Sequence, residues 1–374
     1  MREMKKMKKA ERIIAALFLL LCLLVACGKT SPHAAADPPA LETDAAAPDG
    51  EMDPYLAAAS CQALNLPPDA VLSASDCAAV EELDLFETEI ASLKGIEQFV
   101  NLRVLSVSGG YLTDLTPLQN LTELERVSVS WCYVREIPDL SACRHLDSLE
   151  ITDCCVEDLS PAAKIPWVKI LNFCDNRITS VAPLKELRNL EYLDLSFNPV
   201  LDWDTVQDNL ALQAALPWDY DLALQVQERA RSLAAETVTE GMTDLEKQVA
   251  LCEKIHAIAD NTEAMHPQEP DGYEVLINGR GVCGDFAQAT SLLMNMAGLH
   301  VINCGSDTHA WNMIELDGAW YEFDCMWDDD AAPTDWQYFN LSRADMSEIA
   351  WHDADPLRYP EAPRSMPAAE YLDP

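Results

Sequence analysis

The sequence predicts two unlike folded units in one chain: a solenoid of stacked short strands, followed by an α+β domain. Apolar residues recur every 22 residues from Val80 to Val200, which is typical of repeat architectures. A helical pattern begins after Thr243. Further on, the dipeptide Asp317-Gly318 separates two apolar segments, which predicts a β-hairpin.

The overall composition limits the classes of partner. The chain has 374 residues, of which 49 % are hydrophobic, and this is enough for two domains with buried cores. Its formal net charge is −38. Binding to phosphates needs Lys and Arg to displace counterions, so this charge argues against nucleic acid as a partner. The acidic residues are spread along the chain, which favours a solvated surface.

Residues 1–27 are predicted to be an export signal. A basic start precedes an apolar run, Ile13 to Val25, which is short for a transmembrane helix. The run ends in Leu24-Val25-Ala26-Cys27-Gly28, which resembles the lipobox of bacterial lipoproteins. The resemblance implies that Cys27 is lipidated and that the exported protein is anchored at the extracellular face of the cell membrane. An ordinary cleaved signal or a plain membrane anchor is the alternative.

The remaining chain divides into four parts. Residues 28–50 are rich in Ala, Pro and Asp and lack an apolar period, so we expect a disordered tether. Residues 51–79 are expected to be an N-terminal cap on the repeats. The repeats take residues 80–210 and the second domain residues 211–374. The period fails from Trp203 to Gln225, and a helix is expected from Leu245 to Ala259 with Thr243 as its cap.

The repeat follows the leucine-rich pattern L-x-x-L-x-L-x-x-N/C-x-L. Its first column is Val80, Leu102, Leu124, Leu146, Val168 and Leu190. Each repeat should supply one strand and a return segment. The repeat length, and phrases such as Leu93-Lys94-Gly95-Ile96-Glu97, resemble internalin-type repeats. Cys132 and Cys154 fall in the inward Asn/Cys column and Cys143 in a later apolar column, so all three are expected to be structural.

Outward strand positions should form a concave face. They include Ser106, Ser108, Ser128, Ser130, Glu150, Thr152, Asn172, Cys174, Asp194 and Ser196. We expect this face to bind the substrate or a partner protein; the alternative is that it only orients the second domain. Eleven cysteines follow Cys27, so at least one thiol stays unpaired unless two chains are linked. Cys61 and Cys77 are the candidates for a disulfide.

Cys283 is the candidate nucleophile. It follows glycines and precedes an apolar-periodic segment, which predicts a thiol at the start of a helix. The helix dipole there favours the thiolate, which is the reactive form. The turn before the helix also leaves backbone N–H groups for a developing oxyanion.

The predicted hairpin brings a base and a carboxylate together. A two-residue turn at Asp317-Gly318 pairs Leu316 with Ala319. His309 and Asp324 are then diagonal neighbours on one face, at a distance that an Asp–His hydrogen bond fits. A three-residue loop would break this prediction, because it would reverse the facing of one strand.

Three segments resemble the transglutaminase-like core family. They are Gly281-Val282-Cys283-Gly284-Asp285-Phe286-Ala287, His309-Ala310-Trp311-Asn312, and residues 320–328 of the form W-Y-E-F-D-x-x-W-D. The resemblance extends from about Thr243 to Tyr359. It implies that Cys283 is the nucleophile, His309 the general base and acid, and Asp324 the orienting residue. Many members have Pro and Thr where Cys325 and Met326 stand, but Cys325 should face away from Asp324.

The expected fold is therefore an α/β leucine-rich-repeat solenoid followed by an α+β transglutaminase-like, papain-like domain. The expected function is thiol acyl transfer on amide bonds of a protein or peptide. Bacterial members of the family are more often peptidases or hydrolases than cross-linkers, so we rank a cysteine peptidase or hydrolase first. A protein cross-linking transglutaminase and a non-catalytic surface adhesin or scaffold are the alternatives.

No cofactor and no metal are expected. Cys283, His309 and Asp324 have no C-x-x-C or H-x-x-x-H spacing that would support zinc. Asn278 is a candidate side-chain donor to the oxyanion. The acidic run Asp328-Asp329-Asp330 is predicted to be a solvated loop rather than a calcium site.

Overall fold

The computed structural model describes residues 52–86, 88–262, 269–306, 308–328, 332–349 and 351–366. The predicted export signal, the lipidation site Cys27 and the tether at residues 28–50 lie outside the described residues, as do Asp329 and Asp330. Within the described residues, no helix has both the length and the apolar character needed to span a bilayer.

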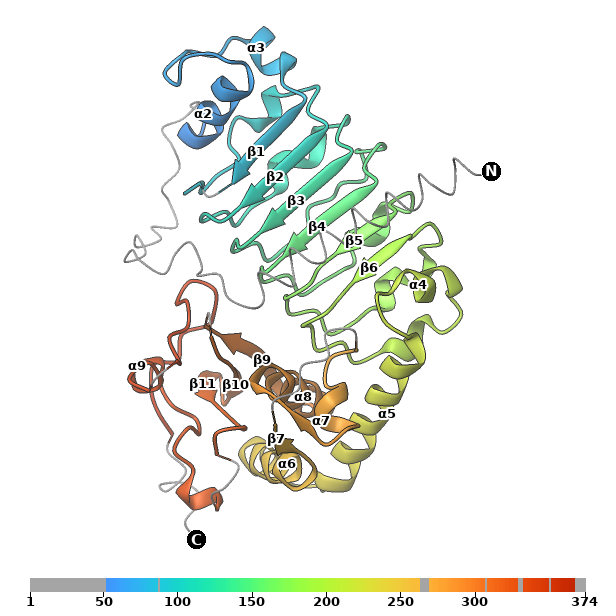
Figure 1. The fold of residues 1–374 in the computed structure, drawn as a ribbon, viewed down its shortest axis with the longest axis vertical. Helices are drawn as coiled ribbons and strands as arrows, with labels where there is room; N and C mark the ends of the chain where they lie inside the picture. The colour runs from blue at the N-terminus through green and yellow to red at the C-terminus, as the bar shows by residue number, and fades with distance from the viewer. Residues whose placement is uncertain are drawn as a thin grey trace.

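The first unit is a solenoid whose strands form one six-stranded parallel sheet in sequence order (Figure 1). The strands are β1 (Glu82–Phe86), β2 (Val104–Ser108), β3 (Arg126–Ser130), β4 (Ser148–Thr152), β5 (Ile170–Asn172) and β6 (Tyr192–Asp194). Leu83 pairs with Leu105, and Leu105 with Val127. The strands therefore stack with the predicted 22-residue offset.

Short helices complete the solenoid. Two α-helices, α2 (Pro54–Ala63) and α3 (Ala74–Ala79), precede the sheet, and α2 packs against β1. The return segments contain η1 (Ile96–Gln98), η2 (Thr116–Asn120), η3 (Ala162–Lys164), η4 (Ala182–Glu186) and η5 (Trp203–Val206). These segments lie opposite the strands and enclose the leucine columns in one continuous core.

The Asn/Cys column binds backbone groups inside the coil. Asn176 Nδ2 donates to the Ile151 carbonyl of the preceding coil (2.7 Å), and Asn198 Nδ2 donates to that of Phe173 (2.8 Å). Cys132 and Cys154 are each 1 % exposed, and Cys143 is fully buried, as a structural role requires. The turn residues Trp131, Asp153, Asp175 and Phe197 repeat with the same period, and all have φ between 50° and 61°. A regular left-handed turn therefore follows these strands and aligns Asp153 beside Asp175.

The eleven cysteines of the described chain are all free thiols. The predicted disulfide between Cys61 and Cys77 is therefore wrong. Cys61 Sγ donates to the Ala70 carbonyl (3.6 Å), whereas Cys77 packs into the core of the repeats. Both thiols are fully buried, so the packing of the two helices accommodates each one without a cross-link.

The segment after β6 joins the two cores. Helix α4 (Leu210–Ala215) packs against β6, and buried side chains as far as Ala223 belong to the core of the repeats. The next helix, α5 (Tyr220–Thr237), has 18 residues and was not predicted. Its first residue, Tyr220, packs with the repeats, whereas Leu233 packs in the second core. Helix α5 is thus shared by the two units.

The second domain packs helices on a three-stranded antiparallel sheet of order β11-β10-β9. Its helices are α6 (Asp244–Ile258), α7 (Tyr273–Leu276), α8 (Cys283–Met296), η6 (Pro333–Asp335) and α9 (Arg343–Ser347). Its strands are β7 (Asp260–Asn261), β8 (Arg280–Gly281), β9 (His300–Gly305), β10 (Ala310–Leu316) and β11 (Ala319–Phe323). Helix α8 packs on β9 and β10 and also contacts α5 and α6. Thr243 caps α6, as predicted.

The hairpin has the predicted register. Leu316 lies opposite Ala319, and the pairing continues to Asn312 opposite Phe323. Asp317 and Gly318 both have left-handed backbones, with φ of 51° and 74°, which a type I′ turn requires. The residues just beyond the two open strand ends are therefore His309 and Asp324.

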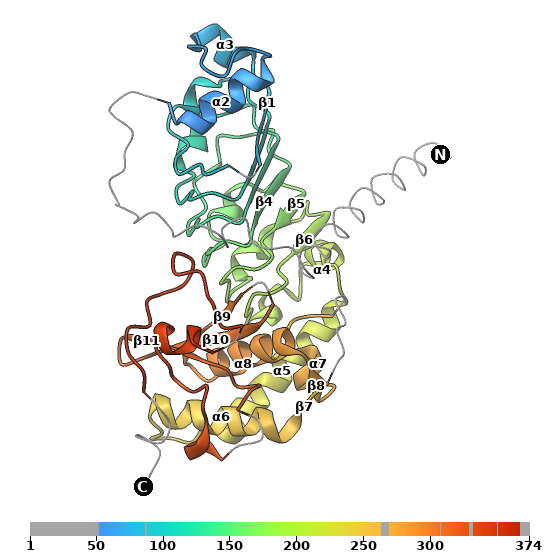
Figure 2. The ribbon, with the colours of Figure 1, turned by 60° about the vertical axis from the view of Figure 1, so that its left-hand side comes forward.

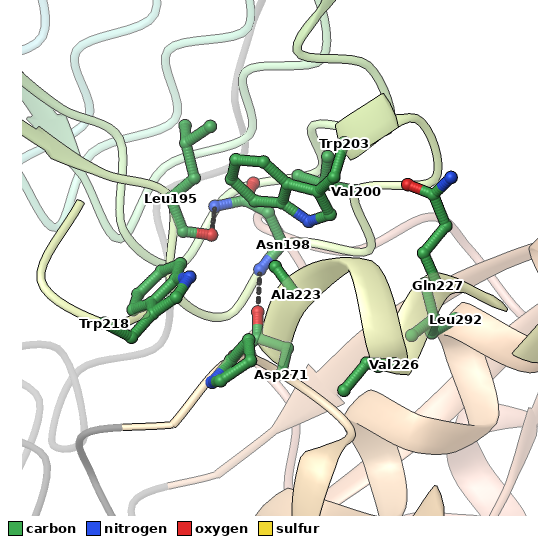
Figure 3. Close-up of a pocket in the computed structure, with 11 residues that line it drawn as sticks. Leu195, Asn198, Val200, Trp203, Trp218, Ala223, Val226, Gln227, Asp271 and Leu292 are labelled. Atoms are coloured by element: carbon green, nitrogen blue, oxygen red, sulfur yellow. Dashed lines mark hydrogen bonds between the residues drawn. The ribbon is translucent and has the colours of Figure 1, made fainter. Parts of the chain in front are cut away.

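Besides helix α5, the described residues of the two units meet through polar contacts at two places. At the last turn of the solenoid, the Asn198 N–H donates to Asp271 Oδ2 (2.9 Å), beside a small cavity to which Trp203 and Trp218 contribute (Figure 3). The C-terminal segment makes the second contact, where it extends from the second domain towards the solenoid turns (Figure 2). There the Tyr133 hydroxyl donates to Asp355 (2.7 Å), and Arg358 pairs with Asp175 (2.9 Å).

Candidate active site

Cys283 is the first residue of α8 and is partly exposed. Asp285 caps this helix end, because its carboxylate accepts the Val282 N–H (2.9 Å). Gly281 leaves room for that cap, since a Cβ there would lie 2.7 Å from the Cβ of Asp285. A Cβ on Gly284 would meet no atom within 4 Å, so the space beside the thiol is open. The helix start therefore presents an accessible thiol in a position that favours an anion.

His309 and Asp324 meet just beyond the ends of β10 and β11. His309 Nε2 lies 2.6 Å from Asp324 Oδ2, and both side chains are buried. The backbone N–H of Trp327 donates to the other carboxylate oxygen (3.1 Å). Because Nε2 faces the carboxylate, Nδ1 is the ring nitrogen left to interact with Cys283, whose thiolate favours the imidazolium. The structure therefore brings the three predicted residues together.

Cys283, His309 and Asp324 shift one another's pKa towards the charged forms. Burial alone would raise the pKa of Cys283, but the hydrogen bond with His309 and the N–H groups of Ala310 and Gly284 lower it overall. Burial alone would lower the pKa of His309, but Asp324 and Cys283 raise it to about 9. Burial would raise the pKa of Asp324, yet its hydrogen-bonded histidines keep it below its usual value. The surroundings thus shift Cys283 towards the thiolate and His309 towards the imidazolium, relative to the free side chains.

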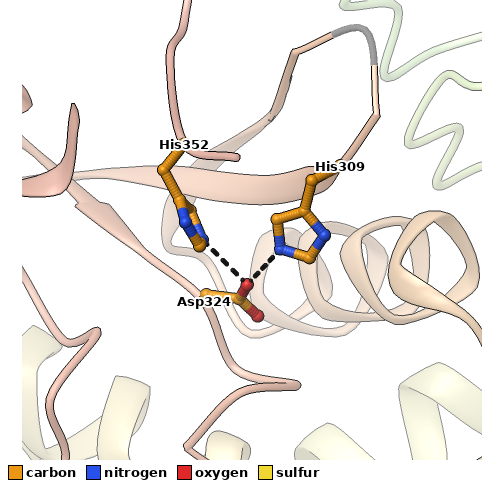
Figure 4. Close-up of side chains that lie close together, drawn as sticks. All are labelled: His309, Asp324 and His352. Atoms are coloured by element: carbon orange, nitrogen blue, oxygen red, sulfur yellow. Dashed lines mark hydrogen bonds and ion pairs between the residues drawn. The ribbon is translucent and has the colours of Figure 1, made fainter. Parts of the chain in front are cut away.

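A fourth residue at the site, His352, was missed by sequence reasoning. Its Nε2 lies 3.1 Å from Asp324 Oδ2, the oxygen that also binds His309 (Figure 4). His352 is 1 % exposed. It stands 28 residues after Asp324, in a segment with no motif or period, so the sequence held no signal for it.

These residues are also the one group in the described chain whose atoms are spaced to suggest a metal ion. The ring nitrogens of His309 and His352 and the Asp324 oxygen lie within 4.8 Å of one another. Zinc accepts such ligands at about 2 Å. Here both Nε2 atoms point at one carboxylate oxygen, at 2.6 and 3.1 Å. Hydrogen bonds thus satisfy the carboxylate without an ion.

Aromatic rings surround His309. The centroid of Trp327 lies 4.9 Å away, and Trp311 stacks at 5.9 Å. Trp311 is fixed in turn, because its Nε1 donates to Glu322 (3.0 Å), a buried carboxylate paired with Arg343 (2.8 Å). Trp311 and Glu322 are therefore structural supports of the imidazole.

Trp351 forms the outer edge of this aromatic group. Its side chain is 63 % exposed, and its ring lies 5.7 Å from that of Trp327. Its φ is 75°, a strained value for a bulky residue. The Ser306 hydroxyl holds its carbonyl at 2.7 Å. The backbone is thus fixed in a conformation that leaves the ring exposed to solvent.

Other predicted residues lie elsewhere. Asn278 Nδ2 donates to Glu274 (2.9 Å), so this amide is already engaged. Cys325 faces away from Asp324, as expected, with its Sγ 3.4 Å from His256 Nε2.

The prediction that Asp328 lies in a solvated loop is wrong. It is 4 % exposed and accepts the N–H groups of residues 337 and 338, so backbone donors rather than water satisfy its carboxylate.

Two family models match parts of the chain. Residues 166–209 match Leucine Rich repeats (2 copies), and residues 231–325 match the Transglutaminase-like superfamily. The second domain is transglutaminase-like. Its matched range includes Cys283, His309 and Asp324. No curated protein matches this chain.

Several solved structures are similar to parts of this chain. An internalin from Listeria monocytogenes is 20 % identical over 45 % of this chain and 55 % of its own, with a TM-score of 0.37. A leucine-rich-repeat protein from Leptospira interrogans is 18 % identical over 38 % of each chain, with a TM-score of 0.35. A "Putative Cysteine Protease" from Cytophaga hutchinsonii is 18 % identical over 26 % of this chain and 37 % of its own, with a TM-score of 0.24. The chain thus spans about half the internalin and less of the other two, and these likenesses do not extend to activity.

Proposed function

We propose that this protein is an exported, lipid-anchored enzyme that hydrolyses amide bonds of a protein or peptide through a thioester on Cys283. The observation that supports this most is the His309–Asp324 hydrogen bond (2.6 Å) together with the place of Cys283, where His309 lowers the pKa of the thiol. A nucleophile, a proton carrier and an orienting carboxylate in that order are the parts that thiol acyl transfer needs. The domain that carries them is transglutaminase-like.

The reaction begins when the Cys283 thiolate attacks the amide carbonyl carbon. A C–S bond forms, and the carbonyl oxygen becomes an oxyanion. The first N–H groups of α8 have no carbonyl partner within the helix, so they can donate to this oxyanion. His309 gives its Nδ1 proton to the leaving amine, the C–N bond breaks, and a thioester remains. Water, deprotonated by His309, then attacks the thioester and releases the acid and the thiolate.

The anchor in this proposal is Cys27. It rests on the lipobox-like sequence from Leu24 to Gly28, which would hold the enzyme at the extracellular face of the membrane. Mass spectrometry of the mature N-terminus tests it: a lipid on residue 27 is expected, and an unmodified chain starting elsewhere contradicts it.

The solenoid in this proposal binds the substrate or a partner protein. Its outward strand positions are partly exposed from β2 to β4, for example Ser106, Ser128 and Glu150. Asn172 and Asp194, on the two strands nearest the second domain, are only 8 % exposed. The free binding surface is therefore the part of the face formed by the earlier strands.

Turnover by single-cysteine variants tests the enzyme. Cys283→Ala removes the atom that forms the thioester, so release of labelled peptides from casein should stop. Cys174→Ala is the matched control, because Cys174 is the other partly exposed cysteine of the described chain, and it should keep full activity. Proteolysis that survives Cys283→Ala contradicts the proposal. If a labelled primary amine is incorporated into the substrate instead, an amine rather than water resolves the Cys283 thioester, and the enzyme is a cross-linking transglutaminase.

A further inference from the structure

His352 is buried in the second domain, although the segment that carries it reaches the solenoid. Its ring lies edge-on to His309 at 4.7 Å and against Trp311 and Trp327, each at 4.8 Å. These three rings restrict the orientation of the imidazole. In that orientation His352 Nε2 is directed at Asp324 Oδ2, 3.1 Å away.

Asp324 is held by three donors. Its Oδ1 accepts the Trp327 N–H (3.1 Å), and its Oδ2 accepts from His309 (2.6 Å) and from His352 (3.1 Å). The carboxylate is 2 % exposed, so protein donors take the place of water. With His352 removed, Oδ2 would have one side-chain donor, His309, and the Trp327 N–H on Oδ1 would be the one remaining contact of these three that fixes the angle at which the two side chains meet.

We propose that His352 is a positioning residue, which fixes the Asp324 carboxylate in line with His309 and so keeps the imidazole directed at Cys283. This inference rests on the proposed function, since it assigns a supporting residue to the same group of Cys283, His309 and Asp324. His352 does not itself reach the thiol in this role. It acts through Asp324, as outer hydrogen-bond partners do in preorganised sites.

The solenoid holds the segment that follows His352. Asp355 accepts from the Tyr133 hydroxyl (2.7 Å), and Arg358 pairs with Asp175 (2.9 Å). Tyr133 and Asp175 both stand on solenoid turns, so the repeats anchor the chain three and six residues beyond His352. The surface proposed to bind a partner therefore belongs to the same unit that keeps the catalytic carboxylate in place.

The segment is also tied down on the N-terminal side of His352. The Ser306 hydroxyl donates to the Trp351 carbonyl (2.7 Å), and the Ser306 N–H donates to the His309 carbonyl (2.9 Å). One serine thus connects the backbone of His309 with the residue before His352. Anchors on both sides leave His352 little freedom to leave Asp324.

The pH dependence of Cys283 alkylation by iodoacetamide tests this inference on the intact protein. The titratable groups around Asp324 and His352 are Cys283, His309, Asp328 and Tyr338, whose ring stacks on His352 at 6.0 Å; burial raises the pKa of Asp328 to about 7. All four remain in every His352 variant, so a change between variants reports on His352. Mass spectrometry of the Cys283 peptide gives its alkylation rate at each pH.

In His352→Ala, we expect the acid limb of the Cys283 curve to move up by about one pH unit, so the rate on that limb falls about tenfold. His352→Gln keeps a side-chain N–H donor and should recover part of the loss. It also keeps the test decisive if the alanine variant unfolds. His300→Ala is the matched control, because His300 is an exposed histidine paired with Glu315, and its curve should equal the wild-type curve.

Three outcomes would overturn, respectively, the positioning role of His352, the proposed function and the role of the solenoid. Coinciding curves for wild type and both His352 variants overturn the positioning role alone. An ordinary thiol curve in the wild type overturns the proposed function and this inference with it. The double variant Tyr133→Phe/Asp175→Asn should shift the curve in the same direction as His352→Ala, but less. If it leaves the curve unchanged, the role of the solenoid is overturned and that of His352 stands.

Discussion

Two cysteines of the described chain are partly exposed, Cys174 and Cys283. Their surroundings act on the thiol in opposite directions. Burial, followed by the nearby carboxylates, raises the pKa of Cys174 well above its usual value. At Cys283 the bonds from His309 and two backbone N–H groups outweigh burial and lower the pKa. At the scale of the residue, charge rather than exposure therefore selects the nucleophile.

The same pKa values predict a bell-shaped dependence of kcat/KM on pH. Attack needs Cys283 as thiolate, so activity should rise with pH through its lowered pKa. Departure of the amine needs His309 protonated, so activity should fall as pH rises through about 9. In Asp324→Asn the imidazolium loses its carboxylate, and the alkaline limb should move to lower pH. An alkaline limb at the same pH in wild type and Asp324→Asn would contradict this account.

At the scale of the element, the start of α8 depends on two glycines with different surroundings. Gly281 lies against Asp285, which caps the helix, whereas Gly284 faces open space. A side chain at residue 281 would have to displace the Asp285 cap, whereas a side chain at residue 284 would have room. The motif around Cys283 therefore combines a packing requirement with an access requirement.

This difference predicts a contrast between two alanine variants. Gly281→Ala places a Cβ 2.7 Å from that of Asp285 and should cost about 1–2 kcal/mol, the range for loss of a helix cap together with local strain. Gly284→Ala should be neutral or stabilising by up to about 1 kcal/mol, since alanine favours the helix. Urea unfolding of both variants checks this. Equal stabilities would show that the cap is not limited by space at Gly281.

Some elements could be predicted from the sequence and others could not. The 22-residue period and the Asp317-Gly318 turn fixed the strand registers, because both are local patterns of spacing. The register in turn placed Asp324 beside His309. Helix α5 was missed because its face changes from one core to the other along its length. His352 was missed because its place depends on tertiary contacts of an irregular segment, which no local pattern encodes.

At the scale of the whole molecule, the two units are joined through polar contacts as well as through α5. Asp271 accepts the Asn198 N–H across one contact (2.9 Å), and Arg358 meets Asp175 in the other (2.9 Å). Burial, and then the carboxylates of Asp194 and Asp175, raise the pKa of Asp271 to about 7. The junction is therefore most stable when this acid is protonated.

The sign of that shift predicts a pH-dependent effect of Asp271→Asn. Between the ordinary value of 3.8 and about 7, the unfolded chain ionises while the folded chain stays neutral, so stability falls as pH rises. Asparagine avoids this penalty and still accepts the Asn198 N–H. The variant should equal the wild type near pH 4 and exceed it by up to about 4 kcal/mol above pH 7 in urea unfolding. A difference that does not grow with pH would contradict the assignment.

The central claim is that the thiol of Cys283 is activated by His309, and its alkylation at neutral pH tests this most directly. In the wild-type protein, iodoacetamide should modify Cys283 at least about tenfold faster than Cys174, Cys132 or Cys154, since only a thiolate reacts. His309→Ala should remove most of that difference while the protein stays folded. If Cys283 reacts no faster than Cys174, or reacts equally fast without His309, the thiol is not activated and the enzyme assignment fails.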